Sequence, residues 1–302
     1  MFSKKCWVGV FSLAVFVAAA GTGWAEEAAP AKTAPQPASS QPVAAPASSQ
    51  PVAASRDPRA LDTLKLMSDK LSQAKSFRFE ARSMKPIKSP SGAWVSLYGT
   101  SRVVKEGSGK LFVETRGDFF PYDFYFDGKT ITAYAPEKNL YAEKAAPGTV
   151  DSMIEKAYQE EGKSFPYADI LRDQPYAILT EGLVSAVFVG QSTFQPLSGA
   201  GNVKTDHLAF SNQGVEWQIW IGTEDHLPRL VCATYLENTG EPSYLVEFGG
   251  WKIDEPVPPE TFVFQNATQA AKVEFRNPMQ QGGGIPSGTA DQQREEPGHE
   301  KQ

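Results

Sequence analysis

The sequence contains very few residues that could bind a metal or form a cross-link: two cysteines and three histidines among 302 residues. Cys6 lies in an N-terminal segment that we expect to be removed, and Cys232 alone cannot form an internal disulfide. His299 lies in a polar tail, so only His207 and His226 remain, too few for a zinc site even with one thiol. We therefore predict a fold stabilised by its apolar core, with no metal, cofactor or disulfide.

The sequence also lacks the motifs of common catalytic sites. It has no Gly-x-Ser-x-Gly turn, no His-Glu-x-x-His motif, no Walker loop and no Gly-x-Gly-x-x-Gly fingerprint. Asp206-His207 is the strongest catalytic candidate, because a carboxylate can orient an imidazole base. Adjacent side chains on a strand point to opposite faces, however, which disfavours a hydrogen bond between these two. We therefore expect a protein that is not an enzyme, and a hydrolase that uses Asp206 or His207 is the least favoured alternative.

Positive charge is in deficit, with 29 lysines and arginines against 35 aspartates and glutamates. Nucleic acid is bound through clustered lysine and arginine, so we expect no nucleic-acid partner. The carboxylates Asp118, Asp123 and Asp127 lack the ligand spacing of a calcium loop. We expect them on solvated strand edges and in a turn.

Long apolar runs are missing after residue 25. Residues 1–25 combine Lys4 and Lys5, an apolar stretch over 7–20 and small residues around Trp24, which is the pattern of a cleavable signal peptide. A membrane-spanning helix needs about 20 apolar residues, more than this stretch offers. We predict cleavage after Ala25, export to the periplasm and no integral membrane span in the mature chain.

Both ends of the mature chain lack a core-forming pattern. Residues 26–55 are rich in alanine, proline, serine and glutamine and repeat ASSQPVAAP as ASSQPVAAS, which is typical of a disordered linker. Residues 278–302 are rich in glycine, glutamine, proline and glutamate and predict a disordered tail. The remaining residues 56–277 have the length of one domain.

Three segments of this domain have helical patterns. Asp57 and Pro58 can begin a helix that reaches residue 74, with apolar residues on one face. Those residues are Leu61, Leu64, Met67, Leu71 and Ala74. Thr149 can cap a second helix over 150–160, and a short third helix is expected over 167–172.

Most of the domain alternates with a period of two, which predicts roughly nine to eleven strands and a fold of the α+β class. The strands are expected at 77–82, 111–116, 122–127, 130–134, 140–143, 184–189, 204–210, 215–221, 229–236 and 243–251. A sheet of this size twists by about 20–25° per strand and must curl or split. We predict a large curved antiparallel sheet that wraps two or three helices.

The inner face of this sheet supplies the candidate site. Alternation places on it Phe77, Phe79, Phe124, Phe126, Trp217, Ile219, Tyr244 and Phe248. Phe124, Phe126, Trp217 and Ile219 are expected beneath the first helix, while Asp123, Glu216 and Gln218 face water. The few helices either fill the interior or leave an apolar cavity, and the pattern alone leaves both alternatives open.

Several motifs carry a resemblance to a known family. They are FRF at 77–79, DGKT at 127–130, DHLAF at 206–210, VEWQIWI at 215–221 and LPR at 227–229. In these motifs the chain resembles the predicted periplasmic proteins of the DUF2092 family, which is similar in architecture to the LolA and LolB lipoprotein carriers. The resemblance implies an unclosed antiparallel half-barrel that is lined with aromatic residues, lidded by helices and able to hold an acyl chain.

We therefore predict a periplasmic, non-catalytic protein that binds a lipid, an acyl chain or another apolar ligand, with the eight inner-face residues as its cavity lining. A lipidated protein would be a partner of the same class. The alternative is an envelope scaffold or sensor that docks another protein through the curved sheet.

Overall fold

The computed structural model describes residues 55–89, 91–118, 121–161, 167–196, 201–236, 240 and 243–275, and for residues 157–161 only the backbone. The predicted signal peptide, the linker up to residue 54 and the tail from residue 278 lie outside this part of the chain. The predicted boundaries of the domain and its tails therefore stay predictions.

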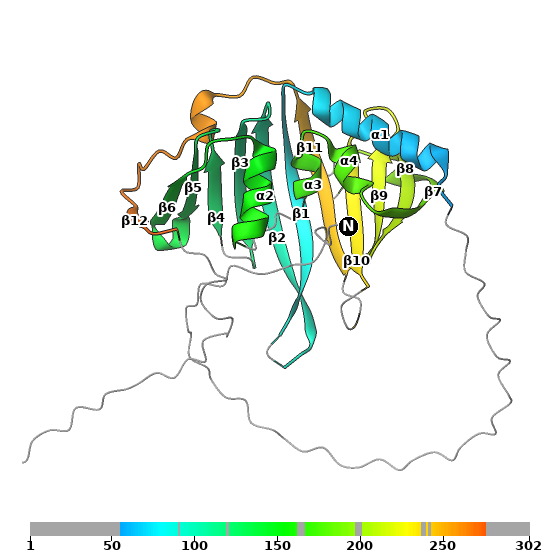
Figure 1. The fold of residues 1–302 in the computed structure, drawn as a ribbon, viewed down its shortest axis with the longest axis horizontal. Helices are drawn as coiled ribbons and strands as arrows, with labels where there is room; N and C mark the ends of the chain where they lie inside the picture. The colour runs from blue at the N-terminus through cyan, green and yellow to red at the C-terminus, as the bar shows by residue number, and fades with distance from the viewer. Residues whose placement is uncertain are drawn as a thin grey trace, which may run out of the picture.

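The described residues form one open sheet of twelve strands, in the order β12-β6-β5-β4-β3-β2-β1-β11-β10-β9-β8-β7 (Figure 1). The strands are β1 (Ser76–Lys88), β2 (Trp94–Glu106), β3 (Lys110–Gly117), β4 (Tyr122–Phe126), β5 (Thr130–Ala135), β6 (Leu140–Ala145), β7 (Leu183–Phe194), β8 (Val203–Asn212), β9 (Val215–Gly222), β10 (Pro228–Tyr235), β11 (Ser243–Ile253) and β12 (Ala271–Val273). The helices are α1 (Pro58–Gln73), α2 (Val150–Glu161), α3 (Ala168–Leu171) and α4 (Pro175–Leu179), with short 3-10 turns η1 (Pro136–Lys138) and η2 (Pro259–Phe262).

The predicted α+β class and the unclosed curved sheet are confirmed. Two strands were not predicted, β2 and β12, and β12 pairs parallel with β6, so the sheet is mixed and not wholly antiparallel. The described chain also has four α-helices where two or three were expected. The helix that was not expected is α4, which follows α3 after three residues. β2 was missed because polar and apolar residues share its outer half, where the burial pattern is irregular.

Local sequence explains where the two long helices begin. The Asp57 side chain accepts a hydrogen bond from the backbone N–H of Arg59 (2.9 Å), and Pro58 occupies the first position of α1. At α2, the Thr149 hydroxyl accepts from the backbone N–H of Ser152 (3.2 Å), and the Ser152 hydroxyl accepts from that of Thr149 (2.9 Å). Both predicted N-caps are therefore confirmed.

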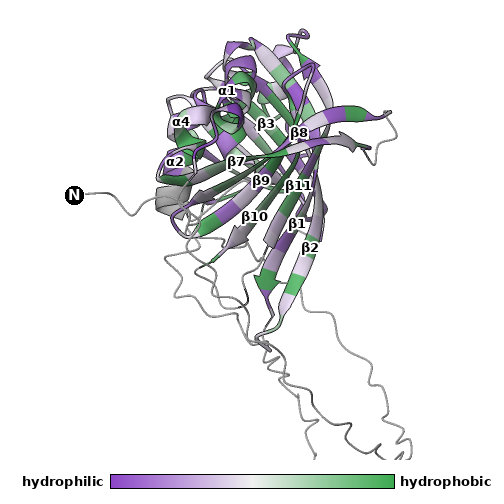
Figure 2. Ribbon diagram, turned by 90° about the vertical axis from the view of Figure 1, so that its right-hand side faces the viewer, coloured by the Kyte–Doolittle hydropathy of each residue, from purple (hydrophilic) through white to green (hydrophobic). Residues whose placement is uncertain are grey.

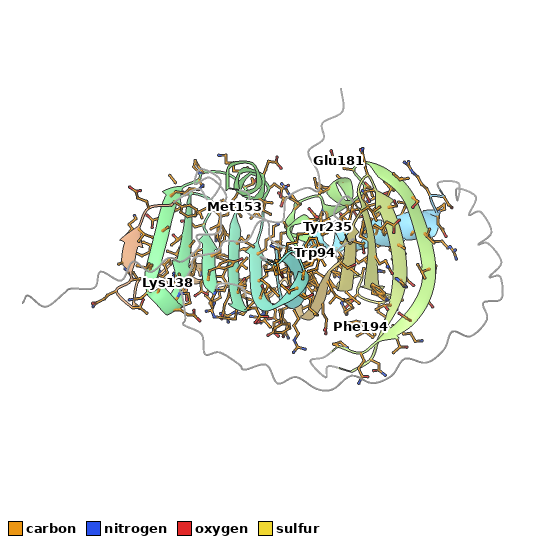
Figure 3. The ribbon with its side chains drawn as sticks, turned by 90° about the horizontal axis from the view of Figure 1, so that it is seen from below. Trp94, Lys138, Met153, Glu181, Phe194 and Tyr235 are labelled. Atoms are coloured by element: carbon orange, nitrogen blue, oxygen red, sulfur yellow. The ribbon has the colours of Figure 1, made fainter. Side chains whose placement is uncertain are left out.

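The helices lie along one face of the curved sheet, and different helices cover its two halves (Figures 1 and 2). α1 packs on β7, β8, β9 and α4, while α2 lies over the half that holds β3 and β4, with Met153 above the strands (Figure 3). The expectation that the first helix covers Phe124 and Phe126 as well as Trp217 and Ile219 is therefore wrong for the first two residues. Trp217 and Ile219 on β9 lie in the half under α1, and Phe124 and Phe126 on β4 lie in the half under α2.

The opposite, convex face is not uniformly wet. Val104, Phe112 and Phe262 form a second buried cluster on it, with Tyr125 and Val257 packed alongside. The chain after β11 crosses this face, and η2 contacts β3 and β4 before β12 joins the edge of the sheet beside β6. We call residues 254–273 the C-terminal strap. The strap explains why Phe112, whose neighbours Leu111 and Val113 belong to the concave-face core, is itself only 6% exposed.

We predict that Phe262→Ala lowers the free energy of unfolding by about 3–5 kcal/mol, because it empties the centre of this second cluster. The neighbouring Val263 is 44% exposed, so Val263→Ala is the matched control and should change stability by less than about 0.5 kcal/mol. Urea denaturation of the two variants measures the difference. Equal stabilities would show that the strap is not held by its phenylalanine.

Candidate functional site

All eight predicted lining residues belong to one buried cluster on the concave face. Their exposed fractions run from 0% for Phe126 to 8% for Phe124. Each side chain is therefore in contact with other parts of the protein over nearly its whole surface. An apolar ligand could reach these residues only if the helical layer moved, and their role as ligand lining stays a prediction.

The centre of the cluster is aromatic. The ring centroid of Phe79 lies 5.5 Å from that of Tyr167, 5.6 Å from that of Phe248 and 4.6 Å from that of Trp251. Tyr167 precedes α3, so the helical layer places an aromatic ring directly on the sheet. Trp251 and Tyr167 were not among the predicted residues, because the β1–β11 register shifts around Gly250 and so changes the alternation before Trp251, while Tyr167 lies outside the strands.

The α1 half of the cluster contains a chain of buried hydrogen bonds. Trp217 stacks on Phe210 (4.3 Å between centroids), and its Nε1–H donates to Asn212 Oδ1 (2.8 Å). Asn212 Nδ2 in turn donates to the carbonyl oxygens of Leu179 (3.2 Å) and Glu181 (2.7 Å) at the end of α4. The indole of Trp217 is thus tied to the end of a covering helix.

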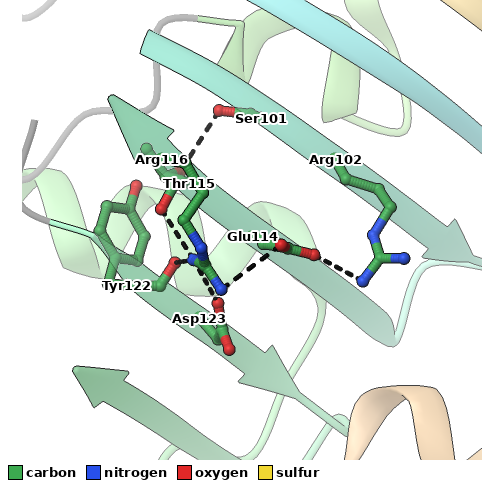
Figure 4. Close-up of polar contacts among 7 residues, drawn as sticks. All are labelled: Ser101, Arg102, Glu114, Thr115, Arg116, Tyr122 and Asp123. Atoms are coloured by element: carbon green, nitrogen blue, oxygen red, sulfur yellow. Dashed lines mark hydrogen bonds and ion pairs between the residues drawn. The ribbon is translucent and has the colours of Figure 1, made fainter. Parts of the chain in front are cut away.

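Between the two halves, the sheet carries small and hydroxyl-bearing side chains. Strand register aligns Tyr122, Thr115, Ser101 and Ala81 across β4, β3, β2 and β1, and the Ser101 and Thr115 hydroxyl oxygens lie 3.2 Å apart (Figure 4). The next row contains Gly117, Gly99 and Ser83. Gly117 has a positive φ of 120°, and a Cβ there would lie 2.6 Å from the Tyr98 carbonyl oxygen of β2, so this position requires glycine.

Three tyrosines converge on these rows. We call the set the hydroxyl cluster: Ser83, Ser101, Thr115, Tyr122, Tyr167 and Tyr244. Burial raises the pKa of Tyr167 well above its ordinary value, and nearby Tyr122 adds to the shift, while Ser101 and Thr115 oppose it. Burial likewise raises the pKa of Tyr122, against the effect of Thr115. The phenols are therefore neutral hydrogen-bond donors at ordinary pH.

Tyr244 is the unusual member of the hydroxyl cluster. Burial raises its pKa well above the usual value, with Tyr167 and Tyr235 adding to the shift and Ser83 opposing it. Its hydroxyl has no hydrogen-bond partner of ordinary geometry among the described residues, Ser83 included. A buried hydroxyl without a partner is unfavourable by about 1–3 kcal/mol.

One residue between α3 and α4, Asp173, ties the helical layer together. Its carboxylate pairs with Lys105 Nζ of β2 (3.0 Å), its backbone N–H donates to Asp151 Oδ1 of α2 (3.0 Å), and its carbonyl accepts from the Ser72 hydroxyl of α1 (2.8 Å). The Lys105 side chain is only 8% exposed, whereas that of Asp173 is 39% exposed. Asp173 therefore joins α1, α2 and the sheet from a position that solvent can reach.

The catalytic alternative finds no support in the positions of its residues. His207 Nε2 lies 2.8 Å from Gln218 Oε1, and the ring stacks on Trp220 (3.9 Å between centroids). Asp206 accepts instead from Gln191 Nε2 (2.9 Å). The two side chains thus have separate partners and do not form the Asp–His pair that a general base would need.

The three acidic candidates are also engaged locally. Asp118 Oδ2 accepts from the Tyr98 N–H (2.9 Å), and Asp127 Oδ1 accepts from the N–H groups of Lys129 and Thr130 at the β4–β5 turn. Asp123 pairs with Arg116 (2.7 Å), within a convex-face network that continues to Glu114 and Arg102 (Figure 4). The described residues contain no group of three potential metal ligands.

Cys232 is half-buried, less than its apolar surroundings in the sequence suggested. Burial raises the pKa of its thiol, so it is a weak nucleophile at neutral pH.

We predict that stability falls steeply above about pH 10, the pKa of tyrosine in an unfolded chain. Because burial raises the folded-state pKa of Tyr122, Tyr167 and Tyr244, the unfolded state releases its protons first, and the free energy of unfolding decreases as pH rises. Each fully suppressed tyrosine contributes a slope of about 1.36 kcal/mol per pH unit. Urea midpoints between about pH 9 and 11 measure this slope.

Tyr244→Phe should make the slope shallower by one such contribution. Tyr98→Phe is the matched control, because Tyr98 is 45% exposed and should leave the slope unchanged. The same slope in Tyr244→Phe and in the parent protein would contradict a raised folded-state pKa for Tyr244.

None of the helices in the described part of the chain has the length and apolar character needed to span a bilayer. A comparison with curated proteins gave no match. Among solved structures, the chain is similar to an uncharacterized conserved protein from Thermus thermophilus, with 11% identity and a TM-score of 0.40 over 72% of this chain and 98% of that one. It is also similar to LprF from Mycobacterium bovis (11% identity, TM-score 0.39, 68% of this chain and 97% of that one).

A further similar structure is the LolA superfamily protein NE2245 from Nitrosomonas europaea, with 10% identity and a TM-score of 0.31 over 68% of this chain and 98% of that one. These similarities are low, and the fold is established by the strands themselves. The model of the family described as "Predicted periplasmic protein (DUF2092)" matches residues 60–276, which include all eight candidate residues and confirm the predicted family. The chain therefore belongs to DUF2092, a family of predicted periplasmic proteins, in agreement with the periplasmic localisation predicted from its sequence.

Proposed function

We propose that this protein binds an acyl chain or another apolar ligand between the concave face of its sheet and the helices that cover it, and that it does so without catalysis. One observation carries the proposal. The concave face is apolar in the halves beneath α1 and α2, and its cover consists of four separate helices, two of them only four and five residues long. Short helices joined by loops can move apart more readily than a second sheet could.

A small set of polar contacts holds this cover in place. Asp173 contributes three of them, and the Tyr176 N–H donates to Ser68 Oγ of α1 (2.9 Å). Arg172 adds a bond to the Asp151 carbonyl oxygen (2.9 Å). Hydrogen bonds of this kind contribute about 0.5–1.5 kcal/mol each, because folding exchanges bonds to water for bonds within the protein. The cover can therefore open without disturbing the strand pairing below it.

Direct binding tests the proposal. Full-length mature protein is purified, extracted with organic solvent and analysed by mass spectrometry for lipids, and it is titrated with a fluorescent fatty-acid probe. We expect extractable acyl chains or saturable probe binding. Hydrogen exchange should change at the amides of residues 150–179 when the probe binds, while the amides under the C-terminal strap should not change. A protein that contains no lipid and does not bind the probe would refute acyl binding.

We predict that Asp173→Ala increases the rate of probe association several-fold and lowers the free energy of unfolding by about 1–3 kcal/mol, since the buried Lys105 loses its carboxylate. Asp69→Ala is the matched control, because it removes a carboxylate from an exposed pair with Lys65 on α1 (2.7 Å) and should do neither. Stopped-flow fluorescence and urea denaturation measure the two effects. An unchanged association rate in Asp173→Ala would show that opening of the α3–α4 segment does not limit binding.

The second candidate is docking of another envelope protein, and the edge strand β7 favours it. Val184, Val187 and Val189 are 46%, 43% and 52% exposed on this strand. Among the described residues, the backbone of 55–57 pairs with this edge at Ala186, through bonds of 2.8 Å in each direction. The rest of the strand presents backbone groups that could pair with an added strand. Failure of the acyl-binding experiments would leave this candidate.

A further inference from the structure

The concave face carries polar groups as well as apolar ones. The hydroxyl cluster lies between the α1 and α2 halves, and β1 continues past it to Lys85. The register pairs Met84 with Leu245, and both side chains lie on the other face by alternation. The next residues, Lys85 and Tyr244, therefore occupy neighbouring positions on the concave face.

Lys85 places a positive charge at this end of the concave face. Its side chain is half-buried, so solvent and a ligand can both reach it. Desolvation lowers its pKa, and an anion beside it would favour its charged form. An ammonium group has three hydrogen-bond donors, so it can bind a ligand oxygen in addition to any contact within the protein.

The Tyr244 hydroxyl supplies a second, independent observation. It is buried, with the residue 6% exposed, and it has no partner among the described residues. Phenylalanine would fill the same volume without the desolvation of a hydroxyl, so tyrosine is the worse choice here for stability alone. A ligand oxygen at this position would accept a hydrogen bond from the Tyr244 hydroxyl, for which the described residues provide no acceptor.

We propose that Lys85 and Tyr244, at the edge of the hydroxyl cluster, bind the carboxylate of a long-chain fatty acid whose hydrocarbon chain lies along the apolar concave face. The proposal rests on the acyl-binding function and names its ligand class. A carboxylate accepts hydrogen bonds from an ammonium and from a phenol, and its negative charge is attracted to the charge of the lysine. The neutral phenols of Tyr122 and Tyr167 lie close enough to Tyr244 to influence its ionisation. They add two further hydroxyl groups near the proposed carboxylate.

Competition against the fluorescent probe tests this assignment with four ligands: oleate, methyl oleate, oleyl alcohol and oleoyl lysophosphatidate. The parent protein should bind oleate at least about tenfold more tightly than the ester or the alcohol, a difference of about 1.4 kcal/mol. Lys85→Met keeps the aliphatic stem and removes the charge, and it should abolish this preference. Tyr244→Phe should reduce the preference and should leave the melting temperature unchanged or higher.

The matched controls are Lys88→Met, three residues further along the same strand, and Tyr98→Phe on β2, and both should keep the preference of the parent. Equal binding of oleate, ester and alcohol by the parent would overturn the carboxylate site while leaving acyl binding intact. So would an unchanged preference in both Lys85→Met and Tyr244→Phe. Tighter binding of the lysophosphatidate than of oleate would replace the carboxylate by a phosphate head group. Binding of none of the four would instead refute the proposed function.

Discussion

The structure depends on one constraint: an open sheet has a concave apolar face that the same chain must cover. A closed barrel would bury its inner face with its own strands, but the sheet here ends at β7 and β12. Burial of apolar surface contributes roughly 25 cal/mol per Å², so leaving this face in water would be more unfavourable than the whole stability of a typical domain. The four helices supply the missing cover: α1 precedes the first meander, β1 to β6, and α2, α3 and α4 lie between it and the second, β7 to β11.

The polar groups within this cover have different energetic roles. Asp173 and Lys105 connect α1, α2 and one strand around one loop, and breaking the pair would leave a buried ammonium without its carboxylate. The bond from Trp217 to Asn212 instead fixes a ring against the end of α4. The Tyr244 hydroxyl stabilises nothing within the described part of the chain, which makes it the group in the core whose chemistry the fold itself least explains.

The period-two pattern predicted most of the sheet because strands with one buried face repeat their apolar residues strictly, as Phe77, Phe79 and Ala81 do. It failed where a strand is covered on both faces. Phe112 alternates with Leu111 and Val113, and all three are buried, since the C-terminal strap covers the convex side. No feature of the sequence near Phe112 indicates that a segment about 150 residues away packs on it.

The candidate site was predicted in the same partial way. Alternation identified the residues on the concave face, but not which helix covers each half or that the cover fills the space above them. The hydroxyl cluster was not predicted, because its members come from β1, β2, β3, β4, β11 and the residue before α3, and only the strand register and the docking of α3 bring them together. Asp173 lies in a short loop with no periodic pattern, so only the folded chain shows its three partners.

The two ends of the described chain are attached to opposite edges of the sheet. Residues 55–57 lie against β7, while β12 lies against β6 with three paired residues. Tension between the two ends would therefore act across the sheet and would load its weakest outer pairing first. Peeling β12 away would lift the strap and uncover Phe112 and Val104 on the convex face, while the concave face beneath the helices stayed closed. The domain thus has a mechanically weak side that is separate from the side on which the proposed ligand lies.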